Sequence, residues 1–219
     1  MKYTLEELIS HTEQSLINSD ANVSKLNQDI LNLDGYSGNK TRHFYNNICS
    51  LENANYLEIG TWKGSSFISA IYRNNINSVV IDNWSEFNGP KEEFLSNVSR
   101  LAPESKYNFI EKDSFEIVKS DLPETMNEID IYLYDGCHTY ECQKKAITHF
   151  YDFFSKYFIL MVDDWRDNSG WQEVLRGTLD GISEKEIIVH KHYTRASFQE
   201  KNGREEYWNG IGIFICEKK

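Results

Sequence analysis

Residues 56–66 read YLEIGTWKGSS. A short apolar run ends at Gly60 and is followed by a predicted helix over 64–74. Gly60 and Gly64 let the backbone turn tightly and approach a ligand closely. The first turn of the helix then offers free backbone N–H groups to an anionic group. The stretch therefore predicts a strand, a tight turn and a helix, with a ligand at the turn.

Similar apolar runs recur along the chain and alternate with helical segments. They are continuous rather than alternating in polarity, which is typical of strands buried on both faces of a parallel sheet. The four further runs cover 78–82, 107–110, 129–134 and 157–162. The helical segments cover 64–74, 91–101, 114–120 and 139–155. This alternation predicts a doubly wound α/β fold.

The two ends of the chain follow different patterns. Residues 1–52 contain predicted helices over 3–18, 22–32 and 40–50, so we expect an N-terminal helical cap on a core formed by 53–219. After a helix near 170–180, apolar runs at 187–189 and 211–215 flank a connection with an Asn202-Gly203 turn signal. These runs predict an antiparallel hairpin. The complete fold is a seven-stranded, mostly parallel sheet in one folding unit.

Composition excludes several classes of partner. The 219 residues include 23 Lys and Arg against 34 Asp and Glu, for a net charge of −11, which disfavours nucleic acid. Since no apolar run reaches about 18 residues, we expect no membrane span. The N-terminus lacks the apolar stretch of a secretory signal. The four cysteines form no CxxC pair, which favours free thiols in the cytoplasm.

The ligand at the turn is predicted from Glu58 and Asp82. Asp82 ends the second apolar run, where a carboxylate accepts hydrogen bonds from ribose hydroxyls. A dinucleotide fingerprint requires GxGxxG, which the sequence lacks, and Glu58 would repel a pyrophosphate. The observed pattern suits a nucleoside that carries an ammonium group, such as S-adenosylmethionine. The alternative is a tight turn whose glycines serve packing alone.

Two further segments carry a family resemblance, YDGCHTY at 134–140 and MVDDW at 161–165. With 58–64, Asp82 and 111–114, they resemble the class I, Rossmann-like S-adenosylmethionine-dependent methyltransferases. The chain is most similar to the small-molecule O-methyltransferases of the macrolide-sugar and catechol type and to the cephalosporin hydroxylase-like group. The resemblance covers residues 53–217.

The resemblance implies a role for each matching residue. The cofactor site would comprise Glu58, Gly60, Trp62, Gly64 and Ser66 around the methionine portion, Asp82 on the ribose, Asn83 and Trp84 beside the nucleoside, Asp113 and Ser114 at the adenine, and Asp135. A magnesium ion would be bound by Asp135, Asp163 and Asp164. His138 would be the general base.

Residue chemistry supports the metal site independently. Asp135 and Asp163 end neighbouring predicted strands, so three carboxylates would meet at one edge and repel each other unless a cation or protons intervened. Oxygen ligands favour Mg²⁺, Ca²⁺ or Mn²⁺. The alternative is that each Asp is a helix N-cap or turn residue, and that His138 caps the next helix.

The resulting hypothesis is an O-methyltransferase that acts on a small hydroxylated molecule, such as a sugar or polyketide, with help from a divalent cation. Two alternatives stay open. One is a nicotinamide-dependent oxidoreductase, and the other is a cofactor-binding module without acceptor chemistry. Apolar positions on the N-terminal helices are compatible with a homodimer.

Overall fold

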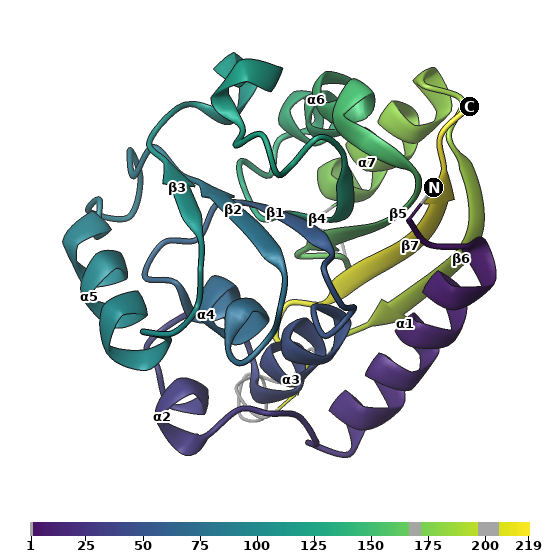
Figure 1. Cartoon of the computed structure of the whole chain (residues 1–219). Coiled ribbons are helices and arrows are strands. Elements are labelled where there is room, and N and C mark those ends of the chain that lie inside the picture. The colour runs from purple at the N-terminus through teal and green to yellow at the C-terminus, as the bar shows by residue number, and fades with distance from the viewer. Residues whose placement is uncertain (1, 167–171, 197–205) are drawn as a thin grey trace.

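The fold is built on one seven-stranded sheet, seen in a computed structural model that describes residues 2–166, 172–196 and 206–219 (Figure 1). The strand order is β3-β2-β1-β4-β5-β7-β6. The parallel strands are β1 (Asn55–Ile59), β2 (Asn77–Ile81), β3 (Asn108–Ile110), β4 (Ile129–Tyr134) and β5 (Phe154–Asp163). The antiparallel strands are β6 (Ile188–Arg195) and β7 (Ile211–Glu217). The predicted doubly wound α/β fold is confirmed.

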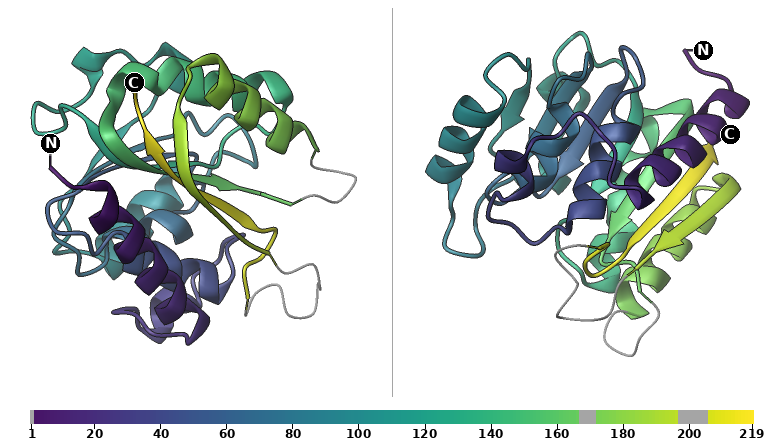
Figure 2. Two further views of the ribbon diagram at one scale, coloured as in Figure 1. Left: turned by 90° about the vertical axis from the view of Figure 1, so that its right-hand side faces the viewer. Right: turned by 90° about the horizontal axis from the view of Figure 1, so that it is seen from below.

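Helices cover both faces of this sheet. One face carries α1 (Leu5–Asp20), α3 (Asn39–Ile48), α4 (Ser65–Ile71) and α5 (Lys91–Leu101). The other carries α6 (Tyr140–Phe150) and α7 (Gln172–Glu184). The left view in Figure 2 shows helices on both sides of the sheet. Every residue of β1 and β4 is buried, as continuous apolar runs predict.

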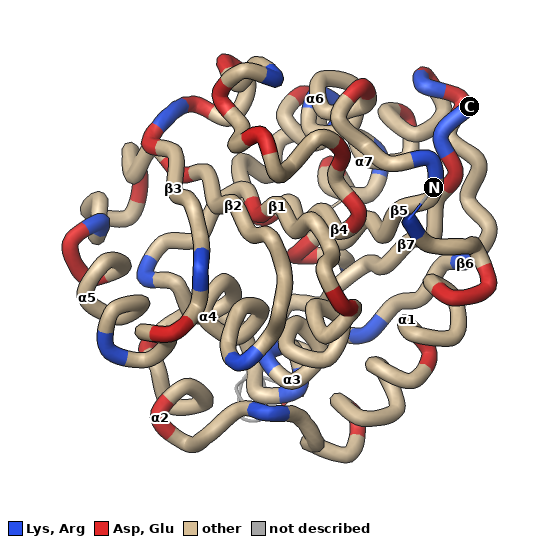
Figure 3. The backbone as a smooth tube through the Cα atoms, in the orientation of Figure 1, with Lys and Arg blue, Asp and Glu red and all other residues tan. Residues whose placement is uncertain are grey.

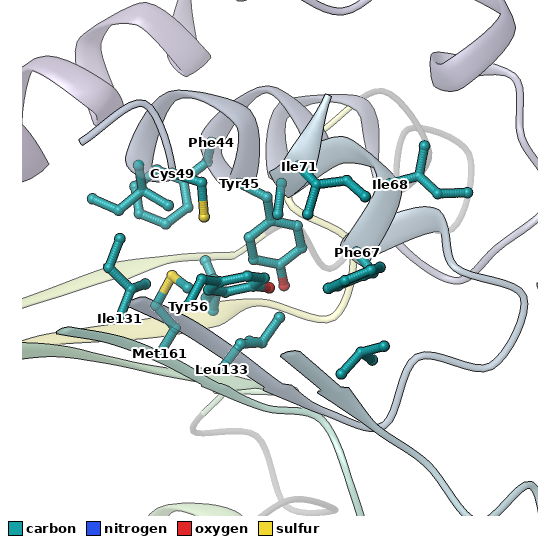
Figure 4. Packing of buried hydrophobic residues seen from close by; sticks show 14 of the residues in the cluster. Phe44, Tyr45, Cys49, Tyr56, Phe67, Ile68, Ile71, Ile131, Leu133 and Met161 are labelled. Atoms are coloured by element: carbon teal, nitrogen blue, oxygen red, sulfur yellow. The ribbon is translucent and has the colours of Figure 1, made fainter. Parts of the chain in front are cut away.

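Successive side chains of the central strands point to opposite faces of the sheet, so the core has two layers. Tyr56, Ile131 and Met161 face the N-terminal helices, and Figure 4 shows them beneath Phe44 and Tyr45 of α3. The neighbouring strand residues point the opposite way, toward α6 and α7. The N-terminal helices therefore bury one whole layer of the sheet's side chains.

Three predicted helices are wrong in extent. The helix over 22–32 is reduced to the single turn α2 (Gln28–Leu31). Residues 114–120 form two 3₁₀ turns, η1 (Ser114–Glu116) and η2 (Lys119–Asp121), because Asp113 and Asp121 accept backbone N–H groups and so compete with helical hydrogen bonds.

The third helix, over 139–155, ends at Phe150 and is followed by the 3₁₀ turn η3 (Tyr151–Phe153) and then by β5. Phe154 continues the four-residue spacing of the helix, but it lies in the strand and stacks on Phe158 at 4.3 Å between ring centroids. A step of four is also a multiple of the strand period of two, so this spacing does not separate the two structures.

The chain ends as predicted, with an antiparallel pair at the sheet edge. β7 lies between β5 and β6 and pairs antiparallel with both. The predicted Asn202-Gly203 turn and the first two residues of the predicted helix over 170–180 lie outside the described residues. No helix in the described part of the chain is long and apolar enough to cross a membrane.

Two glycines on α7 allow close packing against α6, and this contact generates a prediction. A Cβ at Gly177 would overlap the carbonyl of Tyr140 and lie 2.7 Å from Cβ of Gln143. Although alanine normally favours helices by about 1 kcal/mol over glycine, we expect Gly177→Ala to lower the free energy of unfolding by about 1–3 kcal/mol through overpacking. Urea denaturation would measure this difference.

The matched control for Gly177→Ala is Leu179→Ala on the same helix, where the side chain is 47% exposed. This control should change the free energy of unfolding by less than about 1 kcal/mol. A stabilised Gly177→Ala protein would contradict the packing argument.

Candidate active site

A cavity of about 660 Å³ lies at the carboxyl ends of the parallel strands. Its lining includes most of the predicted site residues, namely Gly60, Trp62, Ser66, Asp82, Asn83, Trp84, Asp113, Ser114, Asp135, His138, Asp163 and Asp164. Two predicted residues, Glu58 and Gly64, are not in the lining. The edge where parallel strands end is where α/β proteins bind ligands.

Neighbouring groups lie too close to Gly60 and Gly64 for a side chain to fit at either position. Gly60 has φ of 79°, and a Cβ there would overlap the carbonyl of Asp135. Gly64 has φ of 90°, and its Cβ would lie 2.9 Å from the Phe94 ring. Packing therefore requires glycine at both positions, as the alternative interpretation of the motif held. Gly60 also lines the cavity, so the ligand interpretation stays compatible with this packing.

The Asp82 carboxylate organises two loops of the cavity. Its Oδ2 accepts the backbone N–H groups of Thr61 at 2.9 Å and Trp62 at 3.0 Å, and its Oδ1 accepts that of Trp84 at 2.7 Å. The indole N–H of Trp84 in turn donates to the Trp62 carbonyl at 3.1 Å. Asp82 thus fixes the turn after β1 to the loop after β2.

Glu58 lies beneath the cavity, in the protein interior. Its side chain accepts hydrogen bonds from the Ser66 hydroxyl at 2.6 Å and from the Tyr56 hydroxyl, and it is fully buried. Burial raises its pKa to about 7, although these hydroxyl donors favour the charged form. A pKa of about 7 places the balance between the neutral and the charged Glu58 carboxyl near neutral pH.

Three carboxyl groups and one imidazole meet at the ends of β4 and β5. His138 Nδ1 lies 3.3 Å from Asp164 Oδ2, and His138 Nε2 lies 3.9 Å from Asp135 Oδ1. Burial, and then repulsion between the carboxylates, raises the pKa values of Asp135 and Asp163 far above the usual range. Burial also raises the pKa of Asp164, while His138 and Arg166 oppose this.

The chemistry of this group suits a hard cation, although its arrangement forms no ready metal site. Among residues 2–166, 172–196 and 206–219, no group of three or more His, Cys, Asp or Glu side chains is placed to hold a metal ion. Asp164 Oδ1 is nevertheless buried without a hydrogen-bond partner among the described residues. Oxygen donors of this kind are what Mg²⁺ and Ca²⁺ prefer.

The N-terminal helices contribute a residue that the sequence analysis missed. The Tyr45 hydroxyl of α3 donates to Asp163 Oδ1 at 3.4 Å, and Tyr45 lines the cavity although it is only 1% exposed. The signal in the sequence was ambiguous, because a Tyr next to Phe44 on an apolar helix face is typical of the core. Tyr36, Ser37 and Phe87 also line the cavity and were not predicted.

The loop formed by residues 33–38 docks onto the turn after β1. Asp34 pairs with Lys63 at 3.0 Å, and the Tyr36 ring stacks on Trp62 with 4.7 Å between centroids. A Cβ at Gly35 would overlap the Ser65 side chain. The loop therefore fits residue by residue against the predicted cofactor turn.

Arg42 of α3 holds this loop from inside. The guanidinium is buried and donates through Nη1 to the carbonyls of Ile30, Leu31 and Leu33 at 2.9, 3.0 and 2.8 Å. Its Nε donates to the Ser37 carbonyl at 3.1 Å. A buried charge that satisfies four carbonyls is strongly directional, and it fixes the position of the loop over the cavity.

Comparison with known proteins identifies the domain. Residues 57–165 match the sequence profile of a family described as a methyltransferase domain. No curated protein matches the chain by sequence.

Solved methyltransferase structures share the fold. An O-methyltransferase from Bacillus cereus, in complex with S-adenosylhomocysteine, is 14% identical with a TM-score of 0.58 and covers 96% of this chain and 91% of its own. An O-methyltransferase of tomaymycin synthesis from Streptomyces achromogenes, in complex with S-adenosylmethionine, is 12% identical with a TM-score of 0.57 and covers 93% and 89%. Magnesium protoporphyrin IX methyltransferase from Synechocystis is 11% identical with a TM-score of 0.56 and covers 88% and 93%. At these identities, each likeness establishes the fold alone.

The buried Glu58 carboxyl generates a prediction about pH and stability. Its pKa is about 7 in the folded protein against an ordinary 4.5. Between these values the unfolded chain releases the proton and the folded protein retains it, so the free energy of unfolding falls as pH rises. The loss should total about 3 kcal/mol above pH 7. Glu58→Gln should abolish this component, as urea denaturation at pH 5 and pH 8 would measure.

The control for Glu58→Gln is Glu104→Gln, which changes an exposed carboxylate. The Glu104→Gln protein should show the same pH dependence as the wild type. An unchanged difference between pH 5 and pH 8 in the Glu58→Gln protein would show that Glu58 does not titrate in this range.

Proposed function

Since this protein is an S-adenosylmethionine-dependent methyltransferase of the class I, Rossmann-like type, we propose that it methylates a hydroxyl oxygen of a small molecule. The observation that carries the proposal is the group at the ends of β4 and β5. Asp135, His138, Asp163 and Asp164 line the same cavity as the cofactor motif. Methyl transfer to a hydroxyl oxygen needs a base and a means of orienting the hydroxyl, and this group supplies both kinds of side chain.

In the proposed cofactor site, each part of S-adenosylmethionine meets a different loop. Asp82 would accept the ribose hydroxyls, with Asn83 and Trp84 beside the nucleoside, and Asp113 and Ser114 would contact the adenine. Gly60, Trp62, Gly64 and Ser66 would surround the methionine portion, with Asp135 at its reacting side. Glu58 would stabilise the ammonium group from below, because a nearby cation favours the charged carboxylate.

His138 is proposed as the general base. Its Nδ1 lies 3.3 Å from Asp164 Oδ2, so an Nδ1–H that donates to Asp164 makes Nε2 the proton acceptor. The hydroxyl oxygen would attack the methyl carbon, the carbon–sulfur bond would break to leave S-adenosylhomocysteine, and Nε2 would take the hydroxyl proton. Because the methyl group is already activated on the sulfonium, alignment is the protein's main contribution.

We also propose that Asp135, Asp163 and Asp164 hold a divalent cation, with Mg²⁺ as the first candidate. The buried Asp164 Oδ1, which has no hydrogen-bond partner among the described residues, supports this assignment. When bound, the cation would lower the pKa of the acceptor hydroxyl. A sugar or polyketide hydroxyl is the proposed acceptor. The oxidoreductase alternative has no support, because the domain is a methyltransferase domain.

The cofactor assignment predicts selective binding. S-adenosylhomocysteine should bind and NAD should not, because residues 58–64 together with Asp82 suit an adenosyl amino acid and not a pyrophosphate. Asp82→Ala should weaken S-adenosylhomocysteine binding by about 1–3 kcal/mol, the scale of lost hydrogen bonds to a charged group. Isothermal titration calorimetry would measure both. Equal affinity of wild type and Asp82→Ala would remove Asp82 from the site.

The metal assignment predicts stabilisation by Mg²⁺, since a ligand that binds only the folded state raises the melting temperature. Mg²⁺ should raise the melting temperature of the wild type, and Asp164→Asn should abolish most of this increase while S-adenosylhomocysteine binding persists. Asp152→Asn, at an exposed carboxylate, is the matched control. Equal Mg²⁺ effects on wild type and Asp164→Asn would refute the proposed site.

A further inference from the structure

Three aromatic side chains form a rim on the cavity. Tyr36, Trp62 and Phe87 all line it, and we call them the aromatic rim. Tyr36 stacks on Trp62 with centroids 4.7 Å apart, and its centroid lies 6.3 Å from that of Phe87. Tyr36 is 57% exposed and Phe87 is 67% exposed. Large apolar rings gathered and exposed at a cavity are typical of a binding surface.

Two members of the aromatic rim, Trp62 and Phe87, have backbone conformations that large side chains rarely adopt. Trp62 and Phe87 have φ of 49° each, in the left-handed region. Such conformations persist only where the surrounding structure enforces them, and they concentrate at functional sites. Tyr36 is fixed by the docking of its loop under the buried Arg42. The Trp62 indole N–H donates to the Phe87 carbonyl at 3.3 Å, so contacts within the rim bring three segments of the chain together.

The cavity beside the aromatic rim is strongly acidic. Its described lining contains the carboxyl groups of Asp82, Glu86, Asp113, Asp135, Asp163 and Asp164. The only lysine or arginine in this lining is Lys112, and its ammonium pairs with Asp121 at 3.0 Å. One further cation lies at the rim, since the Lys63 ammonium is 4.6 Å from the centroid of the Trp62 ring and pairs with Asp34 and Glu93. The chain as a whole is acidic, with 34 Asp and Glu against 23 Lys and Arg (Figure 3). Tyr36 and Phe87 are therefore the rim rings that are open to a ligand cation.

These two features select the charge of a ligand. At the aromatic rim, the Glu86 carboxylate repels an anionic group and attracts a cationic one. The faces of Trp, Tyr and Phe rings carry negative potential and bind ammonium groups directly. Glu86 immediately precedes Phe87, so a carboxylate and a ring occur together on one loop of the lining. Aromatic faces and carboxylates in one cavity are the chemistry that recognises an ammonium ion.

We propose that the methyl acceptor is a small hydroxylated molecule that carries an ammonium group, and that the aromatic rim together with Glu86 binds this group. This inference rests on the proposed function and narrows its acceptor from any small hydroxylated molecule to a cationic one. The ammonium group contacts the rim, and the hydroxyl group extends toward the carboxylates and His138.

A pair of matched probes tests the charge preference directly. Choline and 3,3-dimethylbutan-1-ol share a shape and a hydroxyl group, but only choline carries a positive charge. Each is titrated into the S-adenosylhomocysteine-loaded protein, and binding is followed by nuclear magnetic resonance and calorimetry. We expect choline to bind about 5- to 30-fold more tightly than the neutral probe, the range that cation–π contacts supply.

Variants assign the preference to the aromatic rim. Tyr36→Ala, Phe87→Ala and Glu86→Gln should each reduce the preference for choline, whereas Tyr36→Phe should retain it. Tyr193→Ala is the control, because Tyr193 lies on β6 and outside the described cavity lining. Phe87→Ala, Glu86→Gln and Tyr193→Ala should not alter S-adenosylhomocysteine affinity by more than about 3-fold, since none of these residues is in the proposed cofactor site.

Two results would overturn the inference. One is equal binding of the two probes, or no binding of either. The other is a choline preference that survives Tyr36→Ala combined with Phe87→Ala. If the wild-type protein does not bind S-adenosylhomocysteine, the proposed function itself is refuted. This result is distinct from either outcome that overturns the ammonium proposal alone.

Discussion

The carboxylate of Asp82 is the constraint on which the site depends. It sits at the end of β2 and accepts three backbone N–H groups, two from the turn after β1 and one from its own loop. The indole N–H groups of Trp84 and Trp62 add two further bonds between the same segments, to the carbonyls of Trp62 and Phe87. The Asp82 side chain thus connects the segments that follow β1 and β2, and both segments line the cavity.

Much of the fold and the site could be predicted because parallel strands follow simple rules. Continuous apolar runs identified β1 to β5, and residues that end such strands converge at one edge, as Asp82, Asp135 and Asp163 do. The end of α6 could not be predicted, since four-residue spacing suits a helix and a strand equally. Tyr36 and Tyr45 reach the cavity through tertiary docking of the N-terminal segment, which local sequence patterns do not report.

The N-terminal helices are part of the site as well as a cover for the sheet. The α3 helix supplies Tyr45 to the carboxyl group of Asp163, and its Arg42 anchors the loop that carries Tyr36. The same helix buries the layer of the core that contains Tyr56, whose hydroxyl donates to Glu58. The stability of this layer and the electrostatics of the cavity are therefore coupled through shared residues.

Because β7 is the last strand in the chain and lies inside the sheet, the sheet cannot be completed until synthesis has ended. β5, which carries Asp163 into the site, pairs with β4 on one side and with β7 on the other. A ribosome releases β5 well before the residues of β7 emerge, so one edge of this apolar strand stays unpaired in the nascent chain. Unpaired strand edges attract other chains. Until β7 is inserted, this edge of β5 is open to pairing with other chains.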